Sequence, residues 1–374
     1  MSIPFGLMAD LHLHSWSSFS EILADGQNSR LFGLLNEIER CAVEVNKAGG
    51  NRICIAGDIF HVRGSLSPSV LNATSDRLIH ICREYGVGFD IIPGNHDLEG
   101  KESSRLSSAV TALGSIPNVR VINEPTYLKD SGVVMVPWIE SIDKLKETIS
   151  ALGTGKMAKF FRKNTDLILH APIDGVIKGL PSSGLSPEWL AETGFKRVFS
   201  GHYHNHRMMY DGSSGSFATD VYSIGALAHH TWSDIGTRAG YMLVRPNGVE
   251  WRKSHLPEFI DLSQLTDTPP EEIMFVVDQN YVRVKIEADK TKDVESARRE
   301  LLDMGARAVI VQAQPKPPAR ADAGRATVAA GSSLEVSIAE YVAGSSVSTE
   351  NPKLAKSITA ASLEILAAVD SMKE

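Results

Sequence analysis

The residues best suited to chemistry in this chain lie in five short polar clusters. Each cluster comes just after a run of apolar residues that is typical of a buried strand. The clusters are Asp10-Leu11-His12, Gly57-Asp58, Gly94-Asn95-His96-Asp97, His170, and Gly201-His202-Tyr203-His204. Carboxylate, imidazole and amide donors without thiolates suit Mn²⁺, Fe²⁺, Zn²⁺ or Mg²⁺ rather than a structural zinc site. The pattern therefore predicts a site in which two metal ions hydrolyse a phosphate ester.

The predicted metal ligands divide into two sets around one shared carboxylate. Asp58, at the end of the second predicted strand, is the natural bridge between two ions. One ion would be completed by Asp10, His12 and His204, and the other by Asn95, His170 and His202. Two ions about 4 Å apart stabilise the attacking and leaving oxygens of a phosphate ester and lower the pKa of a bound water to about 7.

His96 follows the predicted ligand Asn95 but is expected to point elsewhere. An imidazole beside the metal ions can contact the phosphate and protonate the leaving oxygen. We therefore predict that His96 is the general acid.

The elements that must position these residues are strands that alternate with helices. The apolar runs at residues 5–9, 52–56, 89–92, 167–169 and 197–199 read as strands. Residues 28–48 carry an apolar stripe of helical period, and Ser67 and Pro68 predict a second helix with a capping hydroxyl and a proline at its first position. This alternation favours a largely parallel sheet, and ligands bind outside the carboxyl ends of the strands in such sheets.

The ordered clusters resemble the signature of the calcineurin-like metallophosphoesterase superfamily, which reads D-x-H, G-D, G-N-H-D/E, H and G-H-x-H. The resemblance covers roughly residues 1–260. It implies an α/β fold in which a β-sandwich is flanked by helices, and the runs at 133–138, 221–224 and 240–244 suit the second sheet of that sandwich.

The first cluster alone leaves a second family open. Asp10 to Ser15, followed by Asp25-Gly26, also looks like the opening of the polymerase-and-histidinol-phosphatase metallohydrolases. Gly57-Asp58 and Gly94 to Asp97 have no counterpart in that family's pattern. His14 is then expected to be a rim residue or a loop histidine.

A narrower resemblance begins at the predicted bridging aspartate. Ala56 to His61, followed by Ser65 to Pro68, is similar to the G-D-[IL]-F-H…P-S segment of SbcD-type DNA double-strand-break repair nucleases. The resemblance implies a Mn²⁺-dependent exonuclease and endonuclease that processes DNA ends, forms a homodimer and works with an SMC-like ATPase in repair, recombination and replication. It also implies that His61 supports His96; the alternative is that His61 simply packs beside Phe60.

The later part of the chain divides into smaller segments after a predicted core at residues 1–258. Residues 259–313 are predicted to form a small α+β capping domain, with strands at 273–277, 281–286 and 307–311 and a helix at 291–304. Residues 314–333 are rich in Pro, Ala, Gly and Ser, which indicates a flexible linker. Residues 334–374 are predicted to form two amphipathic helices, which either fold back on the cap or, as the resemblance implies, bind the ATPase.

Composition limits the environment and the partners. The chain has 374 residues, of which 43% are hydrophobic, and only three cysteines, which we expect to be reduced. It shows no basic segment with an apolar signal core and no membrane span, so a soluble cytoplasmic protein is predicted. Its net charge of −7 argues against DNA binding through a general basic surface, although metal ions would supply local positive charge.

Two other function classes remain open on the sequence. A phosphatase or phosphodiesterase acting on nucleotides or other small phosphoesters would use the same ligands. A metal-free scaffold of the same fold would only bind a partner, but the complete ligand set argues against it.

Overall fold

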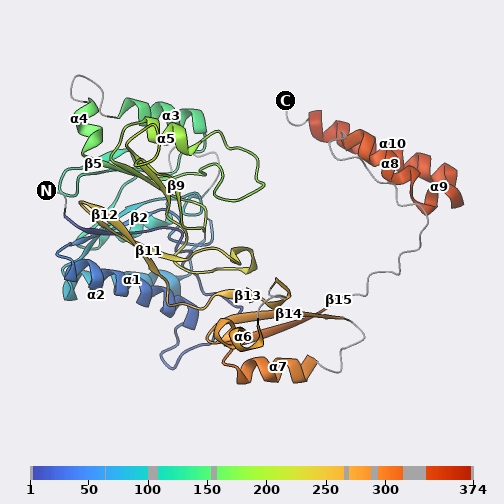
Figure 1. The fold of residues 1–374 in the computed structure, drawn as a ribbon, viewed down its shortest axis with the longest axis horizontal. Helices are drawn as coiled ribbons and strands as arrows, with labels where there is room; N and C mark the ends of the chain where they lie inside the picture. Colours follow the sequence, from blue (N-terminus) through green and yellow to red (C-terminus); the bar gives the residue numbers. More distant parts are fainter. Residues whose placement is uncertain are drawn as a thin grey trace. The chain divides into compact units, whose positions relative to one another are not determined.

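The computed structural model describes residues 3–63, 65–99, 108–152, 158–264, 269–287, 294–314 and 334–371. The chain forms two compact units. The first comprises residues 1–286 and 290–313, and the second comprises residues 287–289 and 314–374. Figure 1 shows the two stacked sheets of the first unit.

The first sheet has the strand order β12-β11-β1-β2-β3-β4. Its parallel strands are β1 (Phe5–Met8), β2 (Arg52–Ala56), β3 (Gly88–Ile92) and β4 (Val119–Val121). β11 (Gly240–Arg245) pairs antiparallel with β1, and β12 (Gly248–Lys253) forms the edge. The helices α1 (Ser29–Lys47) and α2 (Pro68–Glu84) cover the outer face of this sheet (Figure 1).

Both covering helices begin where the sequence predicts. The Asn28 side chain accepts hydrogen bonds from the backbone N–H groups of Arg30 and Leu31, which caps α1. α2 begins at Pro68, but the Ser67 hydroxyl makes no capping hydrogen bond, so that part of the prediction is wrong. The fixed backbone angle of a proline at the first helical position suits this start without a side-chain cap.

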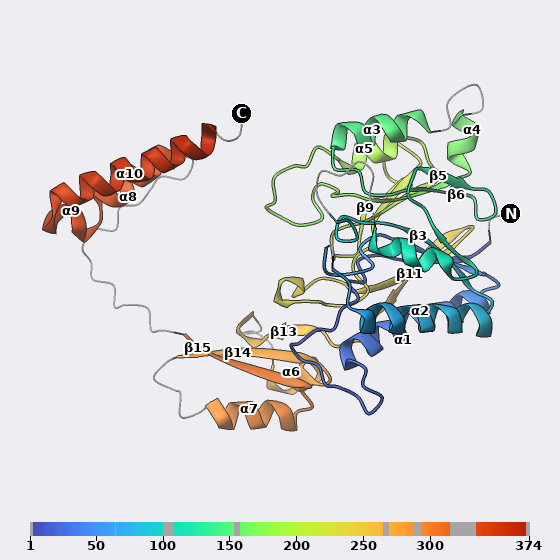
Figure 2. The same cartoon turned by 180° about the vertical axis from the view of Figure 1, so that it is seen from behind.

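The second sheet has the strand order β5-β6-β7-β8-β10-β9. Its strands are β5 (Thr126–Leu128), β6 (Val133–Val136), β7 (Asp166–His170), β8 (Arg197–Gly201), β9 (Arg207–Tyr210) and β10 (Asp220–Ser223). β6, β7, β8 and β10 are parallel to one another. The helices α3 (Ile142–Ala151), α4 (Ala158–Lys163) and α5 (Pro187–Glu192) lie on its outer side, which Figure 2 shows from behind.

One predicted strand belongs to the other sheet. Residues 240–244 suited the second sheet, but they form β11 in the first sheet, where Val244 pairs with Phe5 and Met242 with Leu7. The strands at 133–136 and 220–223 lie in the second sheet, as predicted.

A hydrophobic core fills the space between the two sheets. Side chains alternate along β1, so Phe5 and Leu7 point into this core while Met8 packs under the helices. From the opposite sheet, Met135 and Phe199 complete the layer. All three cysteines are free and buried. The predicted α/β sandwich flanked by helices is confirmed.

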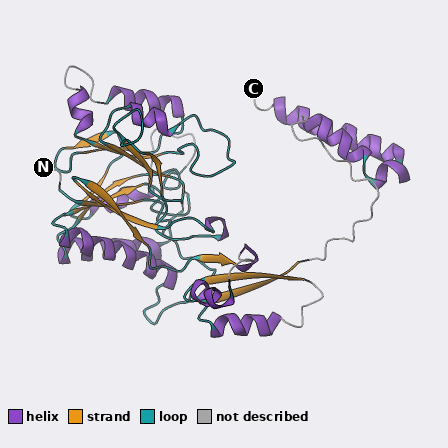
Figure 3. Ribbon diagram, in the orientation of Figure 1, coloured by secondary structure: helices purple, strands orange, loops and turns teal. Residues whose placement is uncertain are grey.

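Within its described residues, the predicted capping segment contains three strands and two α-helices. These are β13 (Phe259–Asp261), α6 (Pro270–Val277), β14 (Tyr281–Glu287), α7 (Val294–Asp303) and β15 (Ala308–Gln314). Figure 3 distinguishes the helices from the strands by colour, and the sheet order is β13-β14-β15. The strand predicted at 273–277 is wrong, because those residues belong to α6, which begins at a proline. The sheet takes its third strand from β13 instead, which pairs parallel with β14.

The second unit consists of α8 (Leu334–Ala343), α9 (Ser346–Glu350) and α10 (Pro352–Ser371), and α8 packs against α10. The predicted linker, apart from Gln314 at the end of β15, lies outside the described residues. The predicted boundaries after residues 258, 313 and 333 stay predictions. Short 3₁₀ helices at Ala109–Ser115, Trp232–Asp234 and Leu262–Gln264 complete the regular structure. Within the described residues, no helix has the length and apolar character needed to cross a membrane.

Candidate metal centre

The five polar clusters meet at one edge of the sandwich. Asp10, Asp58 and Asn95 follow the carboxyl ends of β1, β2 and β3, which are neighbours in the first sheet. His170 ends β7, and His202 follows β8, its neighbour in the second sheet. Because these neighbouring strands are parallel within each sheet, their carboxyl ends collect the side chains at the same edge.

The first ligand group consists of Asp10, His12 and His204. One possible ligand atom from each residue lies within 4.8 Å of those from the other two. The Nε2 atoms of His12 and His204 are 3.2 Å apart. The Asp10 carboxylate accepts hydrogen bonds from the backbone N–H of His202, which fixes its orientation between the two sheets.

The second ligand group consists of Asp58, His170 and His202, whose donor atoms also lie within 4.8 Å of one another. The Asn95 side-chain oxygen joins this group, since it lies 3.1 Å from His170 Nε2 and 3.0 Å from His202 Nδ1. His170 Nδ1 donates to the carbonyl of Ala56 at 2.7 Å, so its Nε2 is the atom available to a metal ion.

Asp58 lies between the two groups. Its Oδ2 atom is 3.8 Å from His12 Nε2 in the first group and 3.5 Å from His170 Nε2 in the second. Its Oδ1 atom accepts the backbone N–H of His96 at 2.8 Å. The carboxylate is therefore placed as a bridging ligand requires.

His96 and His61 lie together beside the first group. The His96 Nδ1–H donates to the backbone carbonyl of His61 at 2.9 Å, which leaves Nε2 available to a substrate. The two rings are stacked with centroids 6.0 Å apart, and the His96 ring lies 4.9 Å from that of His12. The geometry brings every predicted site residue into one region.

The backbone at the strand ends takes conformations that most residues avoid. Asp10, His12, Asp58 and His202 have positive φ angles of 51°, 43°, 52° and 101°. Such angles are uncommon for residues other than glycine and cluster at functional sites. Gly57, with φ of 87°, is required for a second reason, because a Cβ there would collide with the His170 ring.

The burial and charge of these residues fit divalent cations. Asp10 and Asp58 are 0% and 2% exposed, and among the described residues neither forms an ion pair with a lysine or arginine. Burying carboxylates without a compensating cation is costly. Burial lowers the pKa of His202 to about 3, so its imidazole is neutral at physiological pH, which is the form that binds metal.

Two buried aspartates support the ligands and were not assigned a role from the sequence. Asp97 is 1% exposed, and its carboxylate accepts the backbone N–H groups of Gly94, Ile59 and Phe60, which joins the loops after β2 and β3. Its place in the Gly94 to Asp97 cluster is the sequence feature that could have indicated a role for Asp97. Asp234 accepts a hydrogen bond from His204 Nδ1 at 2.8 Å, and no motif marks it.

His229 and His230 form hydrogen bonds with backbone atoms, and neither belongs to a ligand group in the part of the chain that the structure describes. His230 Nε2 donates to the backbone carbonyl of Asp10 at 2.9 Å. His229 accepts the backbone N–H of Phe259 and bonds the carbonyl of Thr237. His14 lies beside His61 and Trp16 and belongs to none of the ligand groups found among the described residues.

Two indole rings flank the centre. Trp138 stacks on His202 with ring centroids 5.1 Å apart. Trp16 lies 4.4 Å from the His61 ring. The second ligand group and the His61 end of the site therefore each contact a tryptophan.

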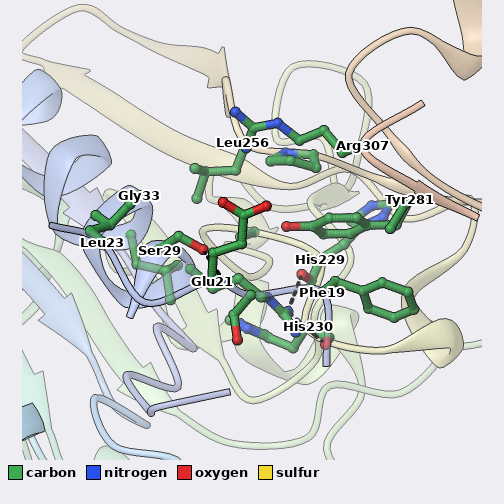
Figure 4. A pocket seen from close by; sticks show the side chains of 16 residues that line it. Phe19, Glu21, Leu23, Ser29, Gly33, His229, His230, Leu256, Tyr281 and Arg307 are labelled. Atoms are coloured by element: carbon green, nitrogen blue, oxygen red, sulfur yellow. Dashed lines mark hydrogen bonds between the residues drawn. The ribbon is translucent and has the colours of Figure 1, made fainter. Parts of the chain in front are cut away.

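A pocket of about 480 Å³ lies behind the first ligand group, between the core and the capping segment. His230 belongs to its wall, and Figure 4 shows Glu21, Tyr281 and Arg307 around it. Arg30, at the start of α1, donates to the carbonyls of His229 and His230 and packs over the Trp16 ring. Among the described residues, no member of the two candidate ligand groups lines this pocket.

Comparison with known proteins gives three findings. The sequence model of the calcineurin-like phosphoesterase family matches residues 3–206. Exonuclease subunit 1 of Enterobacteria phage T4 is 26% identical over 272 residues, an alignment that covers 67% of this chain and 73% of that protein. A dimetal phosphatase from Danio rerio matches in structure with a TM-score of 0.40 and 11% identity, covering 67% of this chain and 96% of that one.

Proposed function

Because the chain belongs to the calcineurin-like phosphoesterase family, and is therefore a metal-dependent phosphoesterase, we propose that it is a nuclease that hydrolyses phosphodiester bonds at DNA ends. The observation that carries the proposal is the pair of ligand groups that share Asp58, with His96 beside them. Such a centre suits in-line displacement at a phosphate.

The proposed roles follow from the donor atoms. Two divalent ions would be held by Asp10, His12, Asp58, Asn95, His170, His202 and His204. When bound, the ions supply positive charge at the phosphate and a nucleophile at neutral pH. We propose Mn²⁺ as the physiological ion; Mg²⁺, Fe²⁺ and Zn²⁺ suit the same donors.

His96 would protonate the departing oxygen through Nε2 and regain its proton from water. The carbonyl of His61 holds the other ring nitrogen, so the imidazole keeps one orientation during turnover. His61 would thus act as a positioning residue for His96.

DNA as the substrate is supported by the segment that ends at His61 and by the 26% identity to a protein named as an exonuclease subunit. That name, which denotes one subunit of an enzyme, also supports a partner for this chain. We propose that an SMC-like ATPase binds the C-terminal helices, on which Tyr341 and Ile365 are 70% and 66% exposed. We also propose that the protein forms a homodimer and acts in the cytoplasm in DNA repair, recombination or replication.

A small-molecule phosphodiesterase is the second candidate. The net charge of −7 favours it, because nucleic acid binding draws much of its affinity from Lys and Arg contacts to phosphate. The two candidates differ in substrate and share the metal centre.

The test is a Mn²⁺-dependent assay of the full chain on duplex DNA ends, single strands and an aryl phosphodiester, with and without the candidate ATPase. The nuclease proposal expects DNA ends to be degraded, faster with the ATPase. Rapid hydrolysis of the aryl ester with DNA left intact would instead establish the second candidate.

Variants assign the roles in the same assay. His96→Ala should lower kcat by roughly 10²–10⁴-fold while the bound metal is retained. Asp58→Ala should empty the site. His80→Ala is the matched control, because His80 is half exposed and paired with Glu39 on α1. Full activity of His96→Ala in a clean preparation would show that the general acid is another group.

A further inference from the structure

Asp234 occupies a position from which it can control one metal ligand. Its carboxylate is buried, with 3% of the residue exposed. Oδ1 accepts a hydrogen bond from His204 Nδ1 at 2.8 Å. An ionised carboxylate has no hydrogen to donate, so the proton lies on His204 Nδ1, and the Nε2 lone pair is directed at the first ligand group.

The carboxylate is itself held rigidly. Oδ2 accepts the backbone N–H groups of His230 at 2.8 Å and Thr231 at 2.9 Å. The same turn orients His230, whose Nε2–H donates to the carbonyl of Asp10 and whose ring lies 5.0 Å from that of His12. One loop, residues 228–237, therefore supports Asp10, His12 and His204 from behind.

We propose that Asp234 is a positioning residue for the metal ion bound by Asp10, His12 and His204, and that it acts by fixing the tautomer of His204. Metal-bound imidazoles commonly donate their second N–H to a carboxylate, and loss of that partner weakens metal binding by roughly 10–100-fold. The inference rests on the proposed metal centre but not on DNA as the substrate.

The same loop also contacts the capping segment. His229 accepts the backbone N–H of Phe259 in β13, and the Arg283 guanidinium of β14 lies 4.5 Å from the centre of the Trp232 ring. Asp234 follows Trp232 by two residues in one turn of 3₁₀ helix. The carboxylate that orients His204 is thus fixed to a turn on which the cap rests.

A purely structural role is the competing explanation, because Asp234 and Thr231 form a capping box around that turn. The Asp234→Asn variant distinguishes the positioning role from the purely structural role. The asparagine oxygen can still accept the N–H groups of His230 and Thr231, so the turn stays capped. Its NH₂ group then faces His204 Nδ1 and can only donate, which moves the imidazole proton to Nε2 and blocks the ligand atom.

The experiment titrates the metal-free full chain with Mn²⁺ by calorimetry and electron paramagnetic resonance. In Asp234→Asn, one of the two sites should bind roughly 10–100-fold more weakly, with the urea midpoint of the metal-free protein unchanged. Thr231→Ala is the control: it removes the capping hydroxyl, should lower the urea midpoint, and should leave both Mn²⁺ affinities as they are.

Nitrogen NMR of His204 in the metal-free wild type adds a readout that needs no variant. The proposal expects the neutral imidazole to carry its proton on Nδ1, and a neutral imidazole protonated only on Nε2 overturns it. Equal Mn²⁺ affinity in Asp234→Asn, or the same loss in Thr231→Ala, also overturns it. Failure of the wild-type chain to bind Mn²⁺ would instead refute the proposed function.

Discussion

At the scale of single residues, the orientation of His96 depends on a backbone atom of its neighbour. The acceptor for His96 Nδ1 is the carbonyl of His61, which any residue at that position would supply. The His61 imidazole contributes ring stacking and contacts Trp16. The two histidines therefore carry different parts of the proposed acid step.

This difference predicts unequal effects of alanine substitution. His61→Ala should lower kcat by roughly 10-fold, less than the loss expected for His96→Ala, because the hydrogen bond to the carbonyl is retained. Steady-state assays of both variants on one substrate measure this order. A His61→Ala enzyme as inactive as His96→Ala would mean that the His61 ring itself takes part in the reaction.

Gly57 predicts a second effect at this scale. Gly57→Ala combines a positive φ with a collision against the His170 ring, so it should weaken metal binding as well as stability. Gly26→Ala is the matched control: its φ is 83°, and a Cβ there would meet nothing within 4 Å, so it should cost only about 1–2 kcal/mol of folding free energy.

Urea unfolding and Mn²⁺ titration of the two glycine variants distinguish two effects. Both variants carry the backbone strain of a positive φ, and only Gly57→Ala adds the collision with the His170 ring. Unchanged Mn²⁺ affinity in Gly57→Ala would show that the His170 ring can move aside without loss of its ligand position.

At the scale of elements, the capping segment holds a charge cluster around the buried carboxylate of Asp261. Asp261 in β13 accepts hydrogen bonds from Arg283 and lies 3.1 Å from Lys285 Nζ, both of β14. Burial alone would raise the pKa of Asp261, but the Ser263, Arg283 and Lys285 contacts outweigh burial and lower that pKa below its usual range.

The direction of this pKa shift predicts how the stability of the capping segment depends on pH. A carboxyl group whose pKa is lowered by folding adds stability above its unfolded pKa of about 4, and that stability is lost as the pH falls below this value. Urea unfolding between pH 2 and pH 6, a window of about 4 units around that pKa, should show this loss in the wild type and less of it in Asp261→Asn. An identical pH dependence in both proteins would contradict the assignment.

The elements also show what the sequence can predict. Five motifs after five apolar runs were enough to place the candidate ligands at one rim, because the end of a parallel strand is a local feature. The short run at 273–277, predicted as a strand, belongs to α6, where Val277 packs with Val282 and Leu301. The periodicity of so short an apolar run does not distinguish a strand from a helix. The sheet to which β11 belongs depends on pairing with β1, more than 200 residues earlier.

The supporting residues illustrate the same limit. Asp234 is an ordinary loop aspartate in the sequence, and its partner His204 is 30 residues away. Asp97 stood inside a recognised motif, but its three backbone donors come from two different loops. The candidate ligands carry a sequence signature, whereas the hydrogen-bond partners of their side chains are set by tertiary contacts.

At the scale of the whole molecule, the ligand groups lie entirely within the first compact unit. A chain ending at Gln314 should therefore fold, bind Mn²⁺ and hydrolyse an aryl phosphodiester as the full chain does. It should lose any stimulation by the candidate ATPase, because α8, α9 and α10 are absent.

Calorimetric Mn²⁺ titration and ATPase-dependent rates of the two chains provide the measurement. Stimulation that survives the truncation would place the partner contact on the first unit instead.

The two tryptophans beside the metal centre give the protein a built-in optical probe. Trp138 stacks on His202, and Trp16 contacts His61, so their emission should be quenched to different degrees as paramagnetic ions enter. The chain has five tryptophans, so the contribution of each of these two is the difference between the emission of the wild type and that of its Trp→Phe variant. The order in which the two positions fill could then be followed by stopped-flow fluorescence, without any label or substrate.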